Sequence, residues 1–289
     1  MRNILLFIDN VAEARGLAKK AIKIANQCKA NLQLCNVAAS QAKEKLVIHH
    51  YDNALDDVLL DECDGVDIED LAQQLKIPEQ SEGAFVPVIN CLEINSFSTR
   101  IIREMVVSHH IWLIIMDERQ LNNLKNVETG NYALKVIENI NCPALLIPED
   151  IQFSHFNKIA YVTDLRYCDL GVLNFLKVFN ALLFVTHISA PGLPDMEERH
   201  AQEILEVISA TARYEWMFLR NLKKNENLKN SIDKALDTLE IKMFVVVNKK
   251  HQTFERLFDD FPKETQIYHN LPTLIFPYLN WFNLGSFYT

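Results

Sequence analysis

Short apolar runs recur along the first half of the chain with little polar alternation inside them. Such runs are typical of strands that helices cover on both faces, as in a parallel sheet. Between the first two runs, Leu17, Ala21, Ile24 and Ala25 recur at helical steps and predict a helix with one buried face. The order strand, helix, strand without hairpin turns predicts a mainly parallel α/β sheet with right-handed crossovers. The predicted strands are Asn3–Asp9, Asn31–Val37, Phe85–Leu92, Trp112–Met116 and Ala144–Ile147, with a further helix at Ser96–Val107.

The same pattern begins again at Phe156, which indicates an internal repeat. We therefore predict two domains at 1–150 and 155–277, joined by a short connector and packed in a fixed arrangement. The first domain carries an acidic insertion at about 38–78, and an aromatic tail at 278–289 follows the second. In the repeat, Ile159–Asp164 corresponds to Ile4–Asp9, Leu182–Ser189 to Leu32–Ala39, Met243–Val247 to Trp112–Met116, and Leu271–Pro277 to Cys142–Pro148.

Composition narrows the class of protein. A chain of 289 residues with 49% hydrophobic content can bury two cores, and a formal net charge of −9 argues against nucleic acid or an anionic membrane as a partner. The opening apolar run is too short for a signal peptide and no run could span a bilayer, so the cytoplasm is the expected compartment. The six cysteines form no C-x-x-C pair, which argues against structural disulfides and zinc.

The segment from Ile111 to Pro148 reads as strand, loop, helix, strand, and it resembles the last βαβ unit of the universal stress proteins. In that Rossmann-like family, which often binds ATP, the penultimate strand commonly ends in Met and runs into G-x2-G-x9-G-[ST]. Counting from Met116, the motif places fall on Asp117, Gln120, Gly130 and Asn131.

The spacing of the motif is kept, whereas most of its chemistry is lost. Glycine at these places lets the backbone approach the phosphates, and free N–H groups at a helix start favour anions. Asp117 instead places a carboxylate where phosphate charge would sit, and like charges repel by roughly 1 kcal/mol at 4 Å in water. We therefore predict that the first site is impaired for ATP.

The second copy departs further from the motif. Counting from Val247, the same places fall on Asn248, His251, Phe261 and Pro262, with no glycine among them. Phe261 would fill space that a nucleotide needs, and Pro262 lacks the N–H that an anion would use.

The resemblance also implies which other residues line the two clefts. In the family, the Asp after the first strand and the backbone after the second usually face the adenosine. These places are Asp9 and Val37 in the first half, and Asp164 and Ile188 in the second. An Asp in this position can equally cap the following helix, so its presence alone is weak evidence of binding.

No other motif nominates a catalytic residue or a metal site. The chain lacks G-x-S-x-G, H-E-x-x-H, a Walker lysine loop and G-x-G-x-x-G after a strand, and it has only seven glycines. The acidic segment around Gly65 fails the EF-hand spacing, because Leu60 and Leu71 fall on ligand positions. We predict no metal and no bound cofactor, with ATP disfavoured.

The resemblance covers nearly the whole chain and implies tandem Rossmann-like domains of the adenine nucleotide alpha hydrolase type. It further implies that the final strands of the two halves pair edge to edge, which makes the chain an intramolecular pseudo-dimer; further homodimerisation is left open. The favoured function is a non-enzymatic stress-response or regulatory protein that has lost ATP binding and acts by stability, ligand sensing or contact with an unidentified protein partner. One alternative is a nucleotide or small-metabolite sensor that uses the first cleft. An adenylating enzyme is the third, and the absence of an S-G-G-x-D-S loop after either first strand counts against it.

Overall fold

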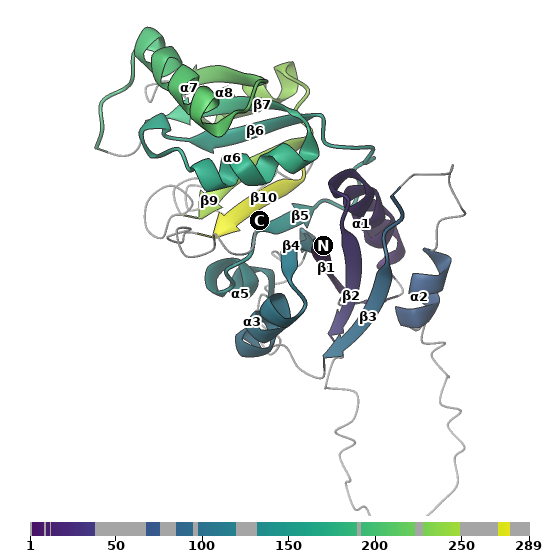
Figure 1. Cartoon of the computed structure of the whole chain (residues 1–289). Helices are drawn as coiled ribbons and strands as arrows, with labels where there is room; N and C mark the ends of the chain where they lie inside the picture. The colour runs from purple at the N-terminus through teal and green to yellow at the C-terminus, as the bar shows by residue number, and fades with distance from the viewer. Residues whose placement is uncertain are drawn as a thin grey trace, which may run out of the picture.

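A computed structural model describes residues 2–8, 10–11, 13–37, 68–75, 85–94, 98–119, 132–189, 192–222, 228–248 and 271–277. The strands in this part of the chain form one ten-stranded sheet in the order β3-β2-β1-β4-β5-β10-β9-β6-β7-β8 (Figure 1). The first half supplies β1 (Asn3–Ile8), β2 (Asn31–Val37), β3 (Ile89–Ile94), β4 (Ile111–Asp117) and β5 (Ala144–Ile147). The second half supplies β6 (Lys158–Thr163), β7 (Leu182–Ile188), β8 (Met217–Leu222), β9 (Met243–Asn248) and β10 (Thr273–Pro277).

Strand direction divides the sheet at its centre. All neighbouring strands within each half are parallel. The strands β5 and β10 pair antiparallel, with Leu145 opposite Leu274. The predicted α/β class and mainly parallel sheet are therefore confirmed, and the last strands of the two halves meet edge to edge as expected.

The bounds of one predicted strand need correction, and one strand has no counterpart in the prediction. The third strand begins at Ile89 rather than Phe85 and ends at Ile94 rather than Leu92. Pro87 explains the later start, because a proline has no N–H to donate to a ladder. The strand β8 was not predicted at all, since Arg220 and Asn221 interrupt its apolar pattern at an outer edge of the sheet.

Helices cover both faces of the sheet, as the unbroken apolar runs predict. Alternating residues of β1 point to opposite sides: Ile4 and Leu6 join one core, and Leu5 and Phe7 join the other. The first core includes α1 (Arg15–Cys28), α2 (Ile68–Gln74), α6 (Leu170–Leu176) and α7 (Glu198–Ala212), with the short helices η2 (Leu165–Tyr167) and η3 (Lys177–Phe179). The second core includes α3 (Thr99–Ser108), α5 (Tyr132–Asn139) and α8 (Leu228–Thr238).

Aromatic side chains from both halves fill the centre of the first core. Trp112 of β4 stacks on Phe175 of α6 with ring centroids 4.0 Å apart and planes 11° apart. Phe175 in turn meets Phe276 of β10 edge to face at 5.0 Å. The Arg2 guanidinium lies 5.4 Å from the centroid of the Trp112 ring. Both halves thus contribute side chains to the first core, so they do not meet there across a polar interface.

One polar face of α1 holds the connector between the halves. Lys20, Lys23 and Gln27 lie on the same side of the helix because they are three and four residues apart. Lys20 Nζ donates to the Pro148 carbonyl at 2.9 Å and also to that of Glu149, and Lys23 Nζ donates to the Phe153 carbonyl at 3.0 Å.

Gln27 completes this set of contacts. Its amide nitrogen donates to the carbonyls of Phe156 and Phe179, both at 2.9 Å. Its amide oxygen accepts from Phe156 N at 2.9 Å. A helix of the first half therefore fixes the backbone that enters the second half.

We expect Phe175→Ala to lower the free energy of unfolding by about 3–4 kcal/mol, as buried aromatic truncations do. The ring is 4% exposed and contacts Trp112 from one half and Phe276 from the other. Urea denaturation followed by circular dichroism measures the change. Val107→Ala is the control, because Val107 is 60% exposed and its truncation should cost less than about 0.5 kcal/mol. Equal midpoints for the two variants would contradict a shared core.

Candidate functional site

The candidate site lies where the parallel strands end at their carboxyl side, the usual place for ligands in open α/β sheets. The order β2-β1-β4 brings the ends of these three strands together, as the sequence predicts. Met116 is a core residue with 1% exposure, and Asp117 ends β4. Val37 ends β2, whereas Asp9, Gln120, Gly130 and Asn131 lie outside the described residues.

The Asp117 carboxylate is held by Arg119, two residues further along. Its Oδ1 accepts from Arg119 N at 2.8 Å and from Arg119 Nε at 3.0 Å. Its Oδ2 accepts from Arg119 Nη2 at 2.8 Å. The Asp117 carboxylate therefore accepts one hydrogen bond from the backbone of a local turn and two from the Arg119 guanidinium. We call this arrangement the Asp-x-Arg clamp. The hydrogen bonds to Asp117 raise the pKa of Arg119 above its ordinary value, although burial opposes the shift.

Further acidic groups surround Arg119. Its Nη1 lies 3.5 Å from Glu13 Oε2 and 3.0 Å from Glu149 Oε2. Lys20 lies close by, and burial lowers its pKa while Asp117 and Glu149 favour its charged form. A phosphate entering here would compete with three carboxylates for one guanidinium. The motif spacing alone leaves Asp117 as an uncompensated charge, whereas its pairing with Arg119 weakens its repulsion of a phosphate.

The second half contains a clamp of the same kind at the end of β6. Asp164 caps η2 by accepting from Arg166 N at 3.0 Å, which confirms the capping alternative for this acid. Arg166 Nη1 donates to Oδ1 at 3.3 Å and to Oδ2 at 3.1 Å, and Nη2 donates to the Pro194 carbonyl at 3.1 Å. The Asp164 side chain is only 4% exposed. The position that faces adenosine in the resembled family is thus filled by contacts within the chain.

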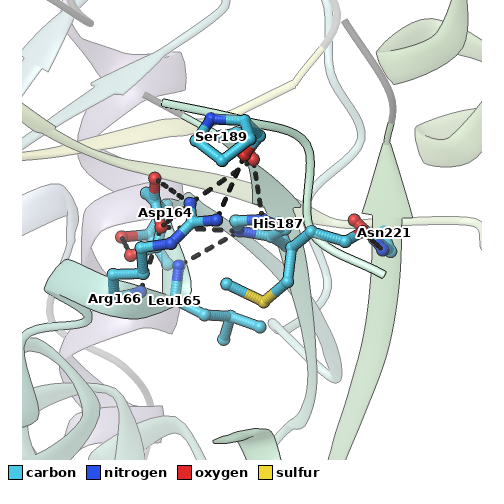
Figure 2. A network of polar contacts seen from close by, with 9 residues as sticks. Asp164, Leu165, Arg166, His187, Ser189 and Asn221 are labelled. Atoms are coloured by element: carbon cyan, nitrogen blue, oxygen red, sulfur yellow. Dashed lines mark hydrogen bonds and ion pairs between the residues drawn. The ribbon is translucent and has the colours of Figure 1, made fainter. Parts of the chain in front are cut away.

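His187 and Ser189 extend this network along β7 (Figure 2). Leu165 N donates to His187 Nδ1 at 3.1 Å, and His187 Nε2 lies 3.2 Å from Ser189 Oγ. Asp164 Oδ1 is 3.9 Å from Nδ1, too far for a hydrogen bond. The trio of Asp, His and Ser therefore invites comparison with a catalytic triad.

The tautomer of His187 argues against that comparison. Because a backbone N–H faces Nδ1, the neutral ring carries its proton on Nε2 and donates it to Ser189. Nucleophile activation needs the reverse, with Nε2 accepting the serine proton and the carboxylate bonded to Nδ1–H. His187 is fully buried, and this burial lowers its pKa and favours the neutral ring. The contacts thus serve to fix the turn after β6.

The remaining predicted cleft residues of the second half are only partly described. Ile188 ends β7 and packs against the second core. Asn248 ends β9, and His251, Phe261 and Pro262 lie outside the described residues. Sequence reasoning missed Lys20, Arg119, Arg166, His187 and Ser189 as members of these networks. An Asp-x-Arg tripeptide directly after a buried strand was the available signal for both arginines.

Among the described residues, no group of three or more His, Cys, Asp or Glu side chains is arranged to hold a metal ion. No helix in that part of the chain is both long and apolar enough to cross a membrane.

Comparison with solved structures identifies the fold. A universal stress protein from Archaeoglobus fulgidus DSM 4304 superposes with a TM-score of 0.58 at 13% identity, covering 95% of this chain and 96% of that chain. A "Putative Universal Stress Protein" from Pseudomonas aeruginosa UCBPP-PA14 gives 0.54 at 16%, covering 96% and 93%. The cytoplasmic domain of a prokaryotic cation chloride cotransporter gives 0.52 at 11%, covering 95% and 94%.

These superpositions show that the chain has the α/β fold of the universal stress proteins along nearly its whole length. At such low identities the likeness extends to the fold alone. No protein-family model matches the sequence, and no curated protein matches it.

We expect Arg119→Ala to lower the free energy of unfolding by about 1–2 kcal/mol, because it leaves the mostly buried Asp117 carboxylate without its partner. Because the Arg119 side chain is 45% exposed, solvent weakens the ion pair and keeps this value below that of a fully buried pair. The control is Arg100→Ala, which removes an ion pair with Glu104 whose side chains are 87% and 64% exposed. In thermal unfolding we expect Arg119→Ala to have a lower midpoint than the unmodified protein and Arg100→Ala to have an unchanged one. Identical midpoints for the two variants would contradict a stabilising clamp.

His187 should make stability depend on pH. Its pKa is lowered in the folded protein, whereas in the unfolded chain it is about 6.5. Protonation therefore favours the unfolded chain as the pH falls through that value, and stability is lost. His187→Asn keeps an acceptor for Leu165 N–H but does not titrate. We expect the urea midpoint of the unmodified protein to fall more steeply below about pH 6.5 than that of the variant. His200→Asn, at an exposed position, is the matched control, and parallel profiles for all three proteins would contradict the expectation.

Proposed function

We propose that this protein is a non-enzymatic, regulatory member of the universal stress protein family whose two clefts do not bind ATP. It acts through contacts with a protein partner, and its fold supplies a stable platform for them. The fold itself does not decide the function, because one fold commonly hosts several functions.

The observation that carries the proposal is the pair of Asp-x-Arg clamps. A carboxylate that recognises a ligand must offer free lone pairs in an accessible position. The Asp164 oxygens instead accept from Arg166 and from the backbone of the same turn, and the side chain is almost fully buried. At the end of β4, Asp117 is likewise engaged by Arg119.

Electrostatics at the first cleft support the same conclusion. Asp117, Glu13 and Glu149 all lie around Arg119, so three carboxylates stand against the two cations Arg119 and Lys20 where the family places phosphates. A phosphate that displaced Asp117 from Arg119 would leave a mostly buried carboxylate without its partner, which is costly. The Leu165 N–H bond to His187 Nδ1 supports the non-enzymatic part of the proposal, because it favours the tautomer with the proton on Nε2, in which Nε2 donates to Ser189 instead of accepting its proton.

The test is calorimetric titration of the folded protein with ATP and Mg²⁺, preceded by mass spectrometry of small molecules released on denaturation. We expect no binding heat, no co-purified nucleotide and no phosphate release above the buffer rate. Micromolar binding or retained nucleotide would overturn the proposal and favour the alternative, a nucleotide or metabolite sensor that uses the first cleft. ATP turnover would overturn its non-enzymatic part. A cooperative thermal transition of the same sample is the control for folding.

A further inference from the structure

The ten-stranded sheet ends in two outer strands, which differ in how well they are protected from pairing with another chain. β3 and β8 are the outer strands of the described sheet, and β3 and β7 lie at opposite ends of the molecule (Figure 1). Outer strands risk pairing with other chains unless proline, charge or a covering element blocks them. β3 follows Pro87 and carries the exposed Glu93. β8 contains no proline and one charged residue, Arg220.

The exposed face of β8 carries a stripe of three side chains. Trp216, directly before the strand, is 59% exposed and Phe218 is 43% exposed. Arg220 is exposed two residues further on. These residues share one face because strand side chains alternate, and Phe218 also stacks on Phe184 of β7 at 5.3 Å. Aromatic residues and arginine are enriched at the centres of protein interfaces.

The backbone of β8 also has groups directed away from the sheet. Leu183 N donates to the Trp216 carbonyl, and Leu183 lies opposite Met217 in the parallel pairing. In such a ladder, alternating residues of one strand bond to the neighbouring strand. The backbone of Trp216, Phe218 and Arg220 therefore faces β7, and that of Met217 and Leu219 faces outward.

We propose that β8 pairs antiparallel with β8 of a second copy of this chain, with the two-fold axis at Phe218. The outward backbone groups then fit this register. Met217 exchanges two hydrogen bonds with the partner's Leu219, and by symmetry Leu219 exchanges two with the partner's Met217. Phe218 lies opposite the partner's Phe218 in a pair without hydrogen bonds, where side chains come closest. Each subunit's Trp216 lies opposite the partner's Arg220.

This register makes the exposed stripe complementary to itself. A guanidinium over an indole ring is a favourable cation–π contact, and the two-fold axis supplies it twice. The two phenylalanines at the axis join the Phe184 rings into one aromatic row. A second copy is therefore favoured over an unrelated peptide, because the stripe of Trp, Phe and Arg provides both sides of its own contact. The β8 edge is a different surface from the two candidate clefts, so dimerisation through it does not depend on whether the clefts bind ATP.

Sedimentation equilibrium of the full chain over a wide concentration range tests the proposal. We expect a monomer–dimer equilibrium, and we expect Arg220→Glu to weaken the dimer by about tenfold or more because each substitution counts twice. The double variant Trp216→Lys/Arg220→Glu should restore it, since Lys at 216 then faces the partner's Glu at 220. These positions are four residues apart along one extended strand, roughly 13 Å, so the rescue can only act between subunits. A monomer at every concentration, or a dimer unaffected by Arg220→Glu, would overturn the proposal.

Cross-linking tests the register itself. Phe218→Cys should give a disulfide-linked dimer under mild oxidation, because Cα atoms in a pair without hydrogen bonds lie roughly 4.5 Å apart, within disulfide range. Arg220→Cys is the matched control, since its thiol faces the partner's Trp216 and finds no symmetric partner. Equal cross-linking by both variants would overturn the register. The unmodified protein shows the background from its own cysteines, and circular dichroism shows that each variant is folded.

Discussion

The structure depends on the antiparallel contact between β5 and β10. Each half ends its parallel ladder with an apolar strand whose outer edge would otherwise be exposed, and each strand completes the other. The contact also sets the aromatic packing beneath it, because it brings Trp112 of one half against Phe175 of the other. Ten strands and two cores therefore behave as one body, and the only outer edges left in the described sheet are β3 and β8.

The sheet is continuous through both candidate sites, and at each of them local side chains set the chemistry. At both sites a carboxylate at the end of a strand is turned back onto the chain by an arginine two residues later. The acids belong to different strands of the repeat: Asp117 ends β4 in the first half, and Asp164 directly follows β6 in the second. The same physical device has thus arisen at two places that the repeat does not relate.

Much of the fold could be predicted because burial on both faces leaves a strong sequence signal. The runs at Asn31–Val37 and Ala144–Ile147 match β2 and β5 in full. The signal fails where a strand is half-exposed, as for β8, in which Arg220 and Asn221 break the pattern. At the site, the motif spacing predicts that Asp117 stands in place of a glycine. The Asp-x-Arg tripeptide does not by itself predict the role of Arg119, since a charged residue after a strand is equally compatible with full solvation.

The bonds of Gln27 have a consequence for how the chain is made. This side chain in the first half bonds to backbone groups 129 and 152 residues later, at Phe156 and Phe179. On a ribosome, α1 therefore emerges long before its partners exist, and one polar face of the helix stays hydrated until the start of the second half leaves the exit tunnel. The first half can collapse early, as domains do during synthesis, but the bonds from α1 form only after the second half has been synthesised. Premature termination between the halves would release a product with an unpaired β5 edge and an open aromatic surface around Trp112.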